Sequence, residues 1–177
     1  MDGRRRPLIA LAITAIALAI TVPPAYGAST RAEYVAQVDP ICQTAAKPEA
    51  KAYYGQVRAN RKLYLQIQAG VPRRRAYEHY FRRAVRFIRR RERVYSGETT
   101  QISAVPPAPG DEQVVGQWLQ KRVESAELLD RAIVAAHRRK FSNMAGFEDF
   151  AGAAEADGEN FVADFGFRYC TPIPSGD

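Results

Sequence analysis

Two groups of charged residues are the features of this sequence that could do chemistry. Ten arginines lie between Arg73 and Arg93, with only Glu78 and Glu92 among them. A guanidinium group holds its charge at any pH and makes forked contacts with phosphate and carboxylate groups. Further along the chain, residues 146–165 include six acidic residues and no basic one. The first group predicts contact with an anionic surface, and the second could partly neutralise it if their helices are adjacent.

Helical periodicity places most of these arginines on one side of a helix. At about 100° per residue, one narrow sector contains Tyr77, Phe81, Ala84, Ile88 and Tyr95. The functional interpretation of the opposite side is a site for phospholipid headgroups or an anionic wall polymer. The alternative is a solvated helix face, because arginine is a good helix former and keeps a surface soluble. The candidate anionic-surface residues are Arg75, Arg82, Arg83, Arg86, Arg89, Arg90 and Arg93.

The cysteines and histidines limit the other kinds of chemistry. In an exported domain, Cys42 and Cys170 predict one disulfide, which would close a loop of more than 100 residues. Two free buried thiols are the alternative. His79 and His137 are the only histidines and lack the spacing of metal ligands, so we expect no metal site. Residues 155–159 faintly resemble a calcium-binding loop, but the ligand positions around them do not match. We find no catalytic or cofactor motif, and expect neither an enzyme nor a cofactor.

The N-terminal segment predicts export. Basic residues 4–6 precede an apolar run over residues 8–22, and small residues before Ala28 fit a cleavage site. The run has 15 residues, whereas a membrane-spanning helix needs about 20. We therefore interpret residues 1–27 as a cleaved signal peptide, with an N-terminal membrane anchor as the alternative. The mature chain, with no spanning segment, would be extracytoplasmic.

Helical patterns cover nearly all of the mature domain, residues 28–170. They predict an all-α bundle of four or five helices, with the disulfide joining the first helix to the C-terminus. We expect Pro40 to kink or interrupt the first helix and Pro48 to end it. A second helix would follow over residues 49–68. Its inner face would carry Tyr53, Val57, Tyr64 and Ile67.

The second half of the domain begins after a proline-rich loop at residues 103–110. Asp111 is expected to cap the next helix. Arg122 lies in the apolar stripe of that helix, so it needs a carboxylate partner or a route to solvent. Residues 171–177 are predicted to form a flexible tail. On the last helix of the domain, one face would carry Phe147, Phe150, Ala154, Phe161 and Phe165.

Three short segments resemble a group of uncharacterised small exported helical proteins of the actinobacterial type. They are residues 33–42 (EYVAQVDPIC), the proline-rich stretch leading into residues 110–112 and 118–119, and the ending at residues 166–170 (GFRYC). Pro40 departs from the pattern of the group. The resemblance implies an extracytoplasmic helical domain with paired cysteines, and it implies no catalytic or binding residues.

Together these features predict a non-enzymatic, exported protein of the cell envelope that acts by binding or scaffolding. Its partner would be phospholipid headgroups or an anionic envelope polymer, whereas nucleic acid is not expected outside the cell. The alternative function is a carrier of a small apolar ligand. That ligand would lie in the bundle core, between the aromatic faces of the helices that begin near Pro72 and Ser142. The sequence leaves open the oligomeric state and whether the protein is released or retained.

Overall fold

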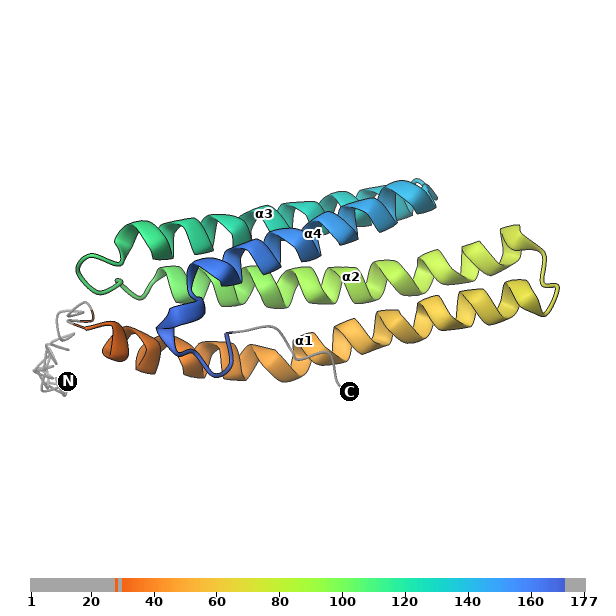
Figure 1. Cartoon of the computed structure of the whole chain (residues 1–177). Helices are drawn as coiled ribbons and strands as arrows, with labels where there is room; N and C mark the ends of the chain where they lie inside the picture. The colour runs from red at the N-terminus through yellow and green to blue at the C-terminus, as the bar shows by residue number, and fades with distance from the viewer. Residues whose placement is uncertain (1–27, 29, 171–177) are drawn as a thin grey trace, which may run out of the picture.

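Four helices make up the computed structural model, which describes residue 28 and residues 30–170 (Figure 1). They are α1 (Arg31–Gln68), α2 (Arg73–Ser103), α3 (Glu112–His137) and α4 (Phe141–Phe161), and the short 3₁₀ helix η1 (Ala163–Phe165) follows α4. The predicted all-α class is confirmed, with no strand in the described residues. The predicted signal peptide at residues 1–27 and the predicted tail at residues 171–177 lie outside them.

The helix α1 runs unbroken through both of its prolines. The predicted interruption at Pro40 and the predicted end at Pro48 are therefore wrong. Each proline removes one helical hydrogen bond. The residues four positions earlier, Ala36 and Thr44, are exposed, so their carbonyl oxygens can bind water instead. Packing against α2 outweighs this cost because one buried stripe continues across both prolines: Tyr34, Val38, Cys42, Ala45, Ala52, Gly55, Ala59 and Leu63.

The helix α2 begins just after Pro72, as expected, and runs to Ser103. In its last turns, the hydroxyl groups of Thr99 and Thr100 donate hydrogen bonds to carbonyl oxygens four residues back, which helix geometry allows. The proline-rich loop follows the end of the helix. Asp111 precedes α3, but its carboxylate binds Arg31 of α1 at 2.5 Å and caps no amide.

The helices form a bundle in which each packs against the next one along the chain: α1 on α2, α2 on α3, and α3 on α4. Its apolar core has two parts. One lies towards the α1–α2 and α3–α4 turns and includes Leu63, Ile88 and Leu129. The other surrounds the opposite end and includes Tyr34 and Trp118. The stretch of bundle between these two parts holds the charged residues described below.

The predicted disulfide between Cys42 and Cys170 is present, with an S–S distance of 2.06 Å. It fastens the segment after η1 to α1, and Figure 1 shows this segment returning across α1. The Asp39 carboxylate supports the same junction by accepting hydrogen bonds from the amides of Arg168 and Tyr169. A disulfide indicates folding in an oxidising compartment. Among the described residues, no helix has the length and apolar character needed to cross a bilayer.

Candidate ligand-binding cleft

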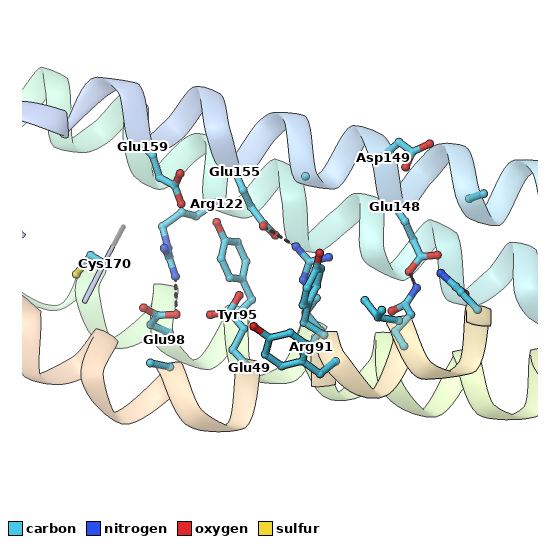
Figure 2. Close-up of a pocket in the computed structure, with 18 of the residues that line it drawn as sticks. Glu49, Arg91, Tyr95, Glu98, Arg122, Glu148, Asp149, Glu155, Glu159 and Cys170 are labelled. Carbon is cyan, nitrogen blue, oxygen red and sulfur yellow. Dashed lines mark hydrogen bonds and ion pairs between the residues drawn. The ribbon is translucent and has the colours of Figure 1, made fainter. Parts of the chain in front are cut away.

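The first and last helices of the bundle leave a cleft between them. No Cα atom of α1 lies within 8 Å of a Cα atom of α4. The space has a volume of about 830 Å³ and is partly open to solvent. Its lining comes mainly from α1 and α4, while α2 contributes Tyr80, Arg91, Tyr95 and Glu98 between them (Figure 2).

Charged residues occupy core positions of α1 and α2 along this cleft. Glu49 lies four residues after the buried Ala45 and three before the buried Ala52. On α2, Arg91 and Glu98 continue the helical spacing of the buried apolar residues. These positions face the interior of the bundle. The polar side chains are thereby directed into the cleft.

The same pattern recurs on the other two helices. Arg122 lies in the buried stripe of α3. On α4, Glu148 and Glu155 lie four residues after the buried Met144 and Ala151. The signal that could have found this site from the sequence is a charge inside an apolar stripe, repeated on every helix. Of these charges, only Arg122 was predicted from the sequence to need a partner in the bundle.

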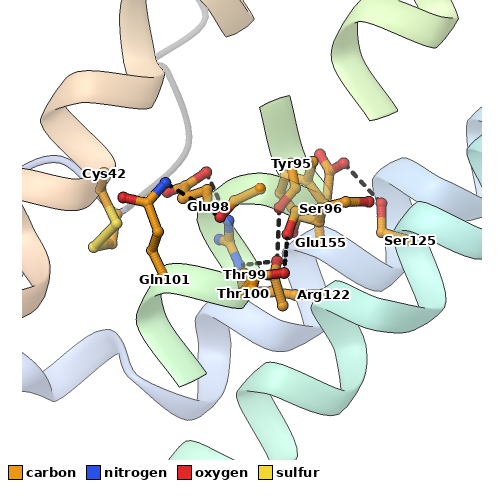
Figure 3. A network of polar contacts seen from close by, with 12 residues as sticks. Cys42, Tyr95, Ser96, Glu98, Thr99, Thr100, Gln101, Arg122, Ser125 and Glu155 are labelled. Carbon is orange, nitrogen blue, oxygen red and sulfur yellow. Dashed lines mark hydrogen bonds and ion pairs between the residues drawn. A yellow bond between two sulfur atoms is a disulfide. The ribbon is translucent and has the colours of Figure 1, made fainter. Parts of the chain in front are cut away.

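Arg122 and Glu98 form the most buried ion pair of the cleft. The Arg122 Nη2 atom lies 2.7 Å from Glu98 Oε2, and each side chain is only 5% exposed. Arg122 Nε also donates to the Thr99 hydroxyl at 3.1 Å (Figure 3). Its guanidinium group lies over the Tyr95 ring, 4.2 Å from the ring centroid. The predicted need of Arg122 for a carboxylate partner is confirmed.

Arg91 crosses the cleft to bind α4. Its Nη2 atom lies 2.5 Å from Glu155 Oε2. The other oxygen of Glu155 accepts a hydrogen bond from the Ser125 hydroxyl at 2.8 Å. The ion pair joins the arginine-rich segment to the acidic segment, as expected if they partly neutralise each other. Its arginine, Arg91, is not one of the seven predicted surface arginines. Further along, the Gln56 amide of α1 donates to the Glu148 carboxylate of α4.

Carboxylates outnumber basic groups in the lining of the cleft. Six acidic residues face two arginines there. Glu49 and Glu159 have neither a hydrogen bond nor an ion pair within the part of the chain that the structure describes. Burial raises the pKa of Glu49 to about 7, and the nearby Glu155 and Glu98 carboxylates add to the effect. Burial, followed by the proximity of Glu155, likewise raises the pKa of Glu159 to about 7.

Aromatic residues of α1 form the other part of the lining. Tyr53 and Tyr54 are 49% and 43% exposed, and both line the cleft with Val57. The predicted inner face of this helix is therefore wrong, since Tyr53, Val57 and Tyr64 are exposed and Ile67 is only half-buried.

The physical reason for this error is how closely α1 approaches α2. A Cβ atom at Gly55 would lie 2.4 Å from the Phe87 ring. Only the small residues on that side of α1 let the two helices meet, so the side with Ala52, Gly55 and Ala59 is buried. The larger aromatic side chains are left facing the cleft or solvent.

The predicted aromatic face of α4 is also only partly correct. Ala154 and Phe165 are buried and Phe147 is half-buried, but Phe150 and Phe161 are exposed. Small residues decide the packing here as well. A Cβ atom at Gly158 would lie 3.0 Å from Lys121 Cβ of α3, so α4 presents its small residues to α3.

The predicted arginine face lies on the outside of α2. Arg75, Arg82, Arg86, Arg89, Arg90 and Arg93 are exposed, Arg83 is half-buried, and none of the seven lines the cleft. Within residues 28 and 30–170, none of the seven forms an ion pair with a carboxylate. Three of them contact rings instead: Arg82 the His79 ring, Arg89 the His137 ring and Arg86 the Phe87 ring.

Comparison of the chain with protein-family models, curated proteins and solved structures gives no match. The resemblance to exported actinobacterial proteins therefore stays a prediction. Across the described residues, no group of three or more histidine, cysteine, aspartate or glutamate residues could hold a metal ion.

Proposed function

We propose that this chain is an exported, non-enzymatic binding protein that holds a small molecule in the cleft between α1 and α4. The observation that carries the proposal is that these two helices stay apart and leave about 830 Å³ between them. Ligand sites typically have volumes of about 300–1,000 Å³ and combine rings with a few polar groups. The volume of this cleft lies in that range and its lining includes aromatic rings, but its many charged groups differ from the purely apolar core site expected for a carrier.

Two independent features support export to the cell envelope or beyond. Residues 1–27 have the order of parts of a signal peptide. The disulfide between Cys42 and Cys170 requires an oxidising compartment to form and persist. A binding protein in that compartment would capture its ligand outside the cytoplasmic membrane.

The proposal is tested by native mass spectrometry of the protein purified from the organism that makes it. Gly152→Trp is the variant to compare, because Gly152 lines the cleft and has nothing within 4 Å of its added Cβ atom. The indole would occupy part of the cleft. Gly116→Trp is the matched control, since Gly116 also lies in a helix with open space around it but outside the cleft.

The expected result is a non-covalent, low-mass adduct on the wild type and on Gly116→Trp, released by denaturation and absent from Gly152→Trp. Absence of an adduct from the wild type would overturn the proposal. So would an adduct that Gly152→Trp retains at the same occupancy, because the ligand would then lie elsewhere.

A second candidate function is attachment to anionic envelope surfaces through the arginine face of α2. The observation in its favour is that six of the seven predicted arginines are exposed and have no carboxylate partner among the described residues. Such a face would hold phospholipid headgroups or an anionic polymer by charge. The two functions are compatible, because none of these arginines lines the cleft.

Sedimentation with phosphatidylglycerol vesicles tests the second candidate. Replacing Arg82, Arg86, Arg89 and Arg93 by glutamine should abolish binding. A control variant that loses Arg58, Arg61, Lys62 and Arg138, all exposed elsewhere, should retain most of it. Binding should also fall steeply as salt rises from about 0.05 to 0.3 M, because screening shortens the reach of the charges. Binding that is insensitive to salt, or that both variants lose equally, contradicts the idea.

A further inference from the structure

The lining of the cleft has more carboxylates than basic groups to pair with them. Its two arginines are each held by one carboxylate, Arg122 by Glu98 at 2.7 Å and Arg91 by Glu155 at 2.5 Å. No lysine lines the cleft. The remaining carboxylates therefore face the space without a basic partner in the lining. Because an ion away from bulk water is costly unless it is paired, a bound positive charge would gain free energy there.

The aromatic wall suits a cation that also has an apolar body. The rings of Tyr53 and Tyr54 meet edge to face with centroids 5.5 Å apart, and both are partly exposed. Phe141 and Tyr80 also line the cleft. Ring faces attract ammonium and guanidinium groups, and they also bury methylene groups.

The carboxylates form two groups along the length of the cleft. Glu148 and Glu155 lie seven residues apart on α4, which is about 10 Å along a helix. Figure 2 shows Glu148 and Asp149 at one end, whereas Glu155 and Glu159 lie towards the other. On α1, Tyr53 lies between the levels of Glu49 and Gln56. Tyr53 therefore lies at a level between the two acidic groups.

We propose that the cleft binds an elongated organic cation, with amino or guanidino groups at the ends of an apolar body. This inference rests on the proposed function of the cleft as a ligand site. Glu49 and Glu159 would bind one cationic end, Glu148 and Asp149 would bind the other, and the rings of α1 would cover the body between them. An anion is disfavoured because Arg91 and Arg122 are already paired and nearly buried, so it would meet the surplus carboxylates.

Three probes with the same eight-carbon chain separate the charge of a ligand from its shape. They are 1,8-diaminooctane, 1,8-octanediol and suberate, and their binding to the disulfide-bonded protein is measured by calorimetry at about pH 8, where the carboxylates are ionised. We expect the diamine to bind at least about tenfold more tightly than the diol, because charge-assisted hydrogen bonds are the stronger ones. Suberate should not bind.

The double variant Glu49→Gln with Glu159→Gln should weaken binding of the diamine by at least about tenfold and leave binding of the diol unchanged. Glutamine keeps the shape of glutamate, so the change tests its charge alone. Glu127→Gln is the matched control, because Glu127 is exposed on α3 and lies outside the cleft lining. It should bind the diamine as the wild type does.

The outcomes distinguish the ligand class from the function of the cleft. If the diol or suberate binds as tightly as the diamine, and Gly152→Trp abolishes that binding, the cationic class is overturned while the cleft remains a ligand site. If no probe binds but the protein from its own organism has an adduct that needs the cleft, the class is again overturned and the proposed function stands. If no probe binds and the protein from its own organism has no adduct, both the cationic class and the proposed function are overturned. Unchanged diamine binding in the double variant overturns the assignment of the cationic end.

Discussion

The α3–α4 contact and the α1–α4 cleft lie on two sides of the same helix and have opposite chemistry. Against α3, α4 presents Ala151, Ala154 and Gly158, and the two backbones approach closely. Towards α1, the core positions of α4 hold Glu148 and Glu155 instead, and the helices stay apart. Two helices of the bundle pack closely where the residues that face each other are small and apolar. They stay apart where carboxylates would have to be buried against one another, because burial of like charges costs more than apolar contact gains.

Loss of the disulfide should lower the free energy of unfolding more than any other change considered. The bond fastens the segment after η1 to α1, at one end of the α1–α4 cleft. In Cys42→Ser with Cys170→Ser, the free energy of unfolding should fall by about 4–5 kcal/mol, since the cysteines are 128 residues apart. Urea unfolding followed by circular dichroism measures it. Chemical reduction of the wild type should give a similar loss. A loss below about 1 kcal/mol would mean that the open side is held together by other contacts.

Breaking the ion pair between Arg122 and Glu98 should cause the second-largest loss of unfolding free energy. Arg122→Met leaves a buried carboxylate unpaired and should cost about 3–5 kcal/mol of unfolding free energy. The double variant with Glu98→Met should recover most of that loss, since an apolar pair of similar volume tolerates burial. Arg138→Met, at the exposed end of α3, is the control and should change stability by less than about 0.5 kcal/mol. Equal stability of Arg122→Met and the wild type would show that the pair contributes nothing.

A pair of glycine substitutions compares a closed side with the open side directly. Gly55→Ala places a Cβ atom 2.4 Å from the Phe87 ring and should destabilise the protein by about 1–3 kcal/mol through overpacking. Gly152→Ala adds the same methyl group to the cleft, with nothing within 4 Å. It should stabilise the protein by about 0.5–1 kcal/mol, because alanine is the better helix former. Thermal unfolding of both variants measures the sign of each change in stability. Two changes of the same sign would contradict the distinction between a closed and an open side.

The helical class, the disulfide and the proline-rich loop could be predicted from the sequence because each depends on local patterns or on cysteine pairing. The continuity of α1 could not, because two prolines locally favour a break and only the packing of its buried stripe against the rest of the bundle overrides them. The orientation of α1 was wrong for a related reason. Size alone favours burial of Tyr53 and Val57, but the close approach of α2 at Gly55 admits only small residues.

The candidate site was mostly missed because its residues are ordinary surface types when taken one at a time. For Arg122, a charge in an apolar stripe predicts a carboxylate partner or a route to solvent, and the structure supplies the partner, Glu98. Glu49 and Arg91 carry the same signal at the same spacing, but they lie next to charged segments that read as solvated faces. Only the position of all four helices shows that these charges meet. The raised pKa of the carboxylates in the cleft could not be predicted from any single helix.

The pH dependence that Glu49 confers is expected to be smaller than the effect of the disulfide or of the buried ion pair. Burial, and then the Glu155 and Glu98 carboxylates, raise its pKa from 4.5 to about 7. The folded protein therefore keeps a proton that the unfolded chain loses, so this residue's contribution to stability falls as the pH rises from about 4.5 to about 7. Two basic groups oppose the shift, Arg91 and Arg122.

Glu49→Gln removes this loss, because glutamine stays neutral. The variant should match the wild type near pH 4.5 and exceed it by about 1–2 kcal/mol near pH 8, after allowance for solvent in the open cleft. The difference in unfolding free energy between variant and wild type, measured across that range, isolates Glu49 from other titrating groups. Glu127→Gln should show no such trend. A difference that stays constant with pH would mean that the Glu49 carboxyl ionises as freely as in water. The cleft would then be wide enough at this point to solvate its carboxylates, and an organic cation would gain less by replacing that water.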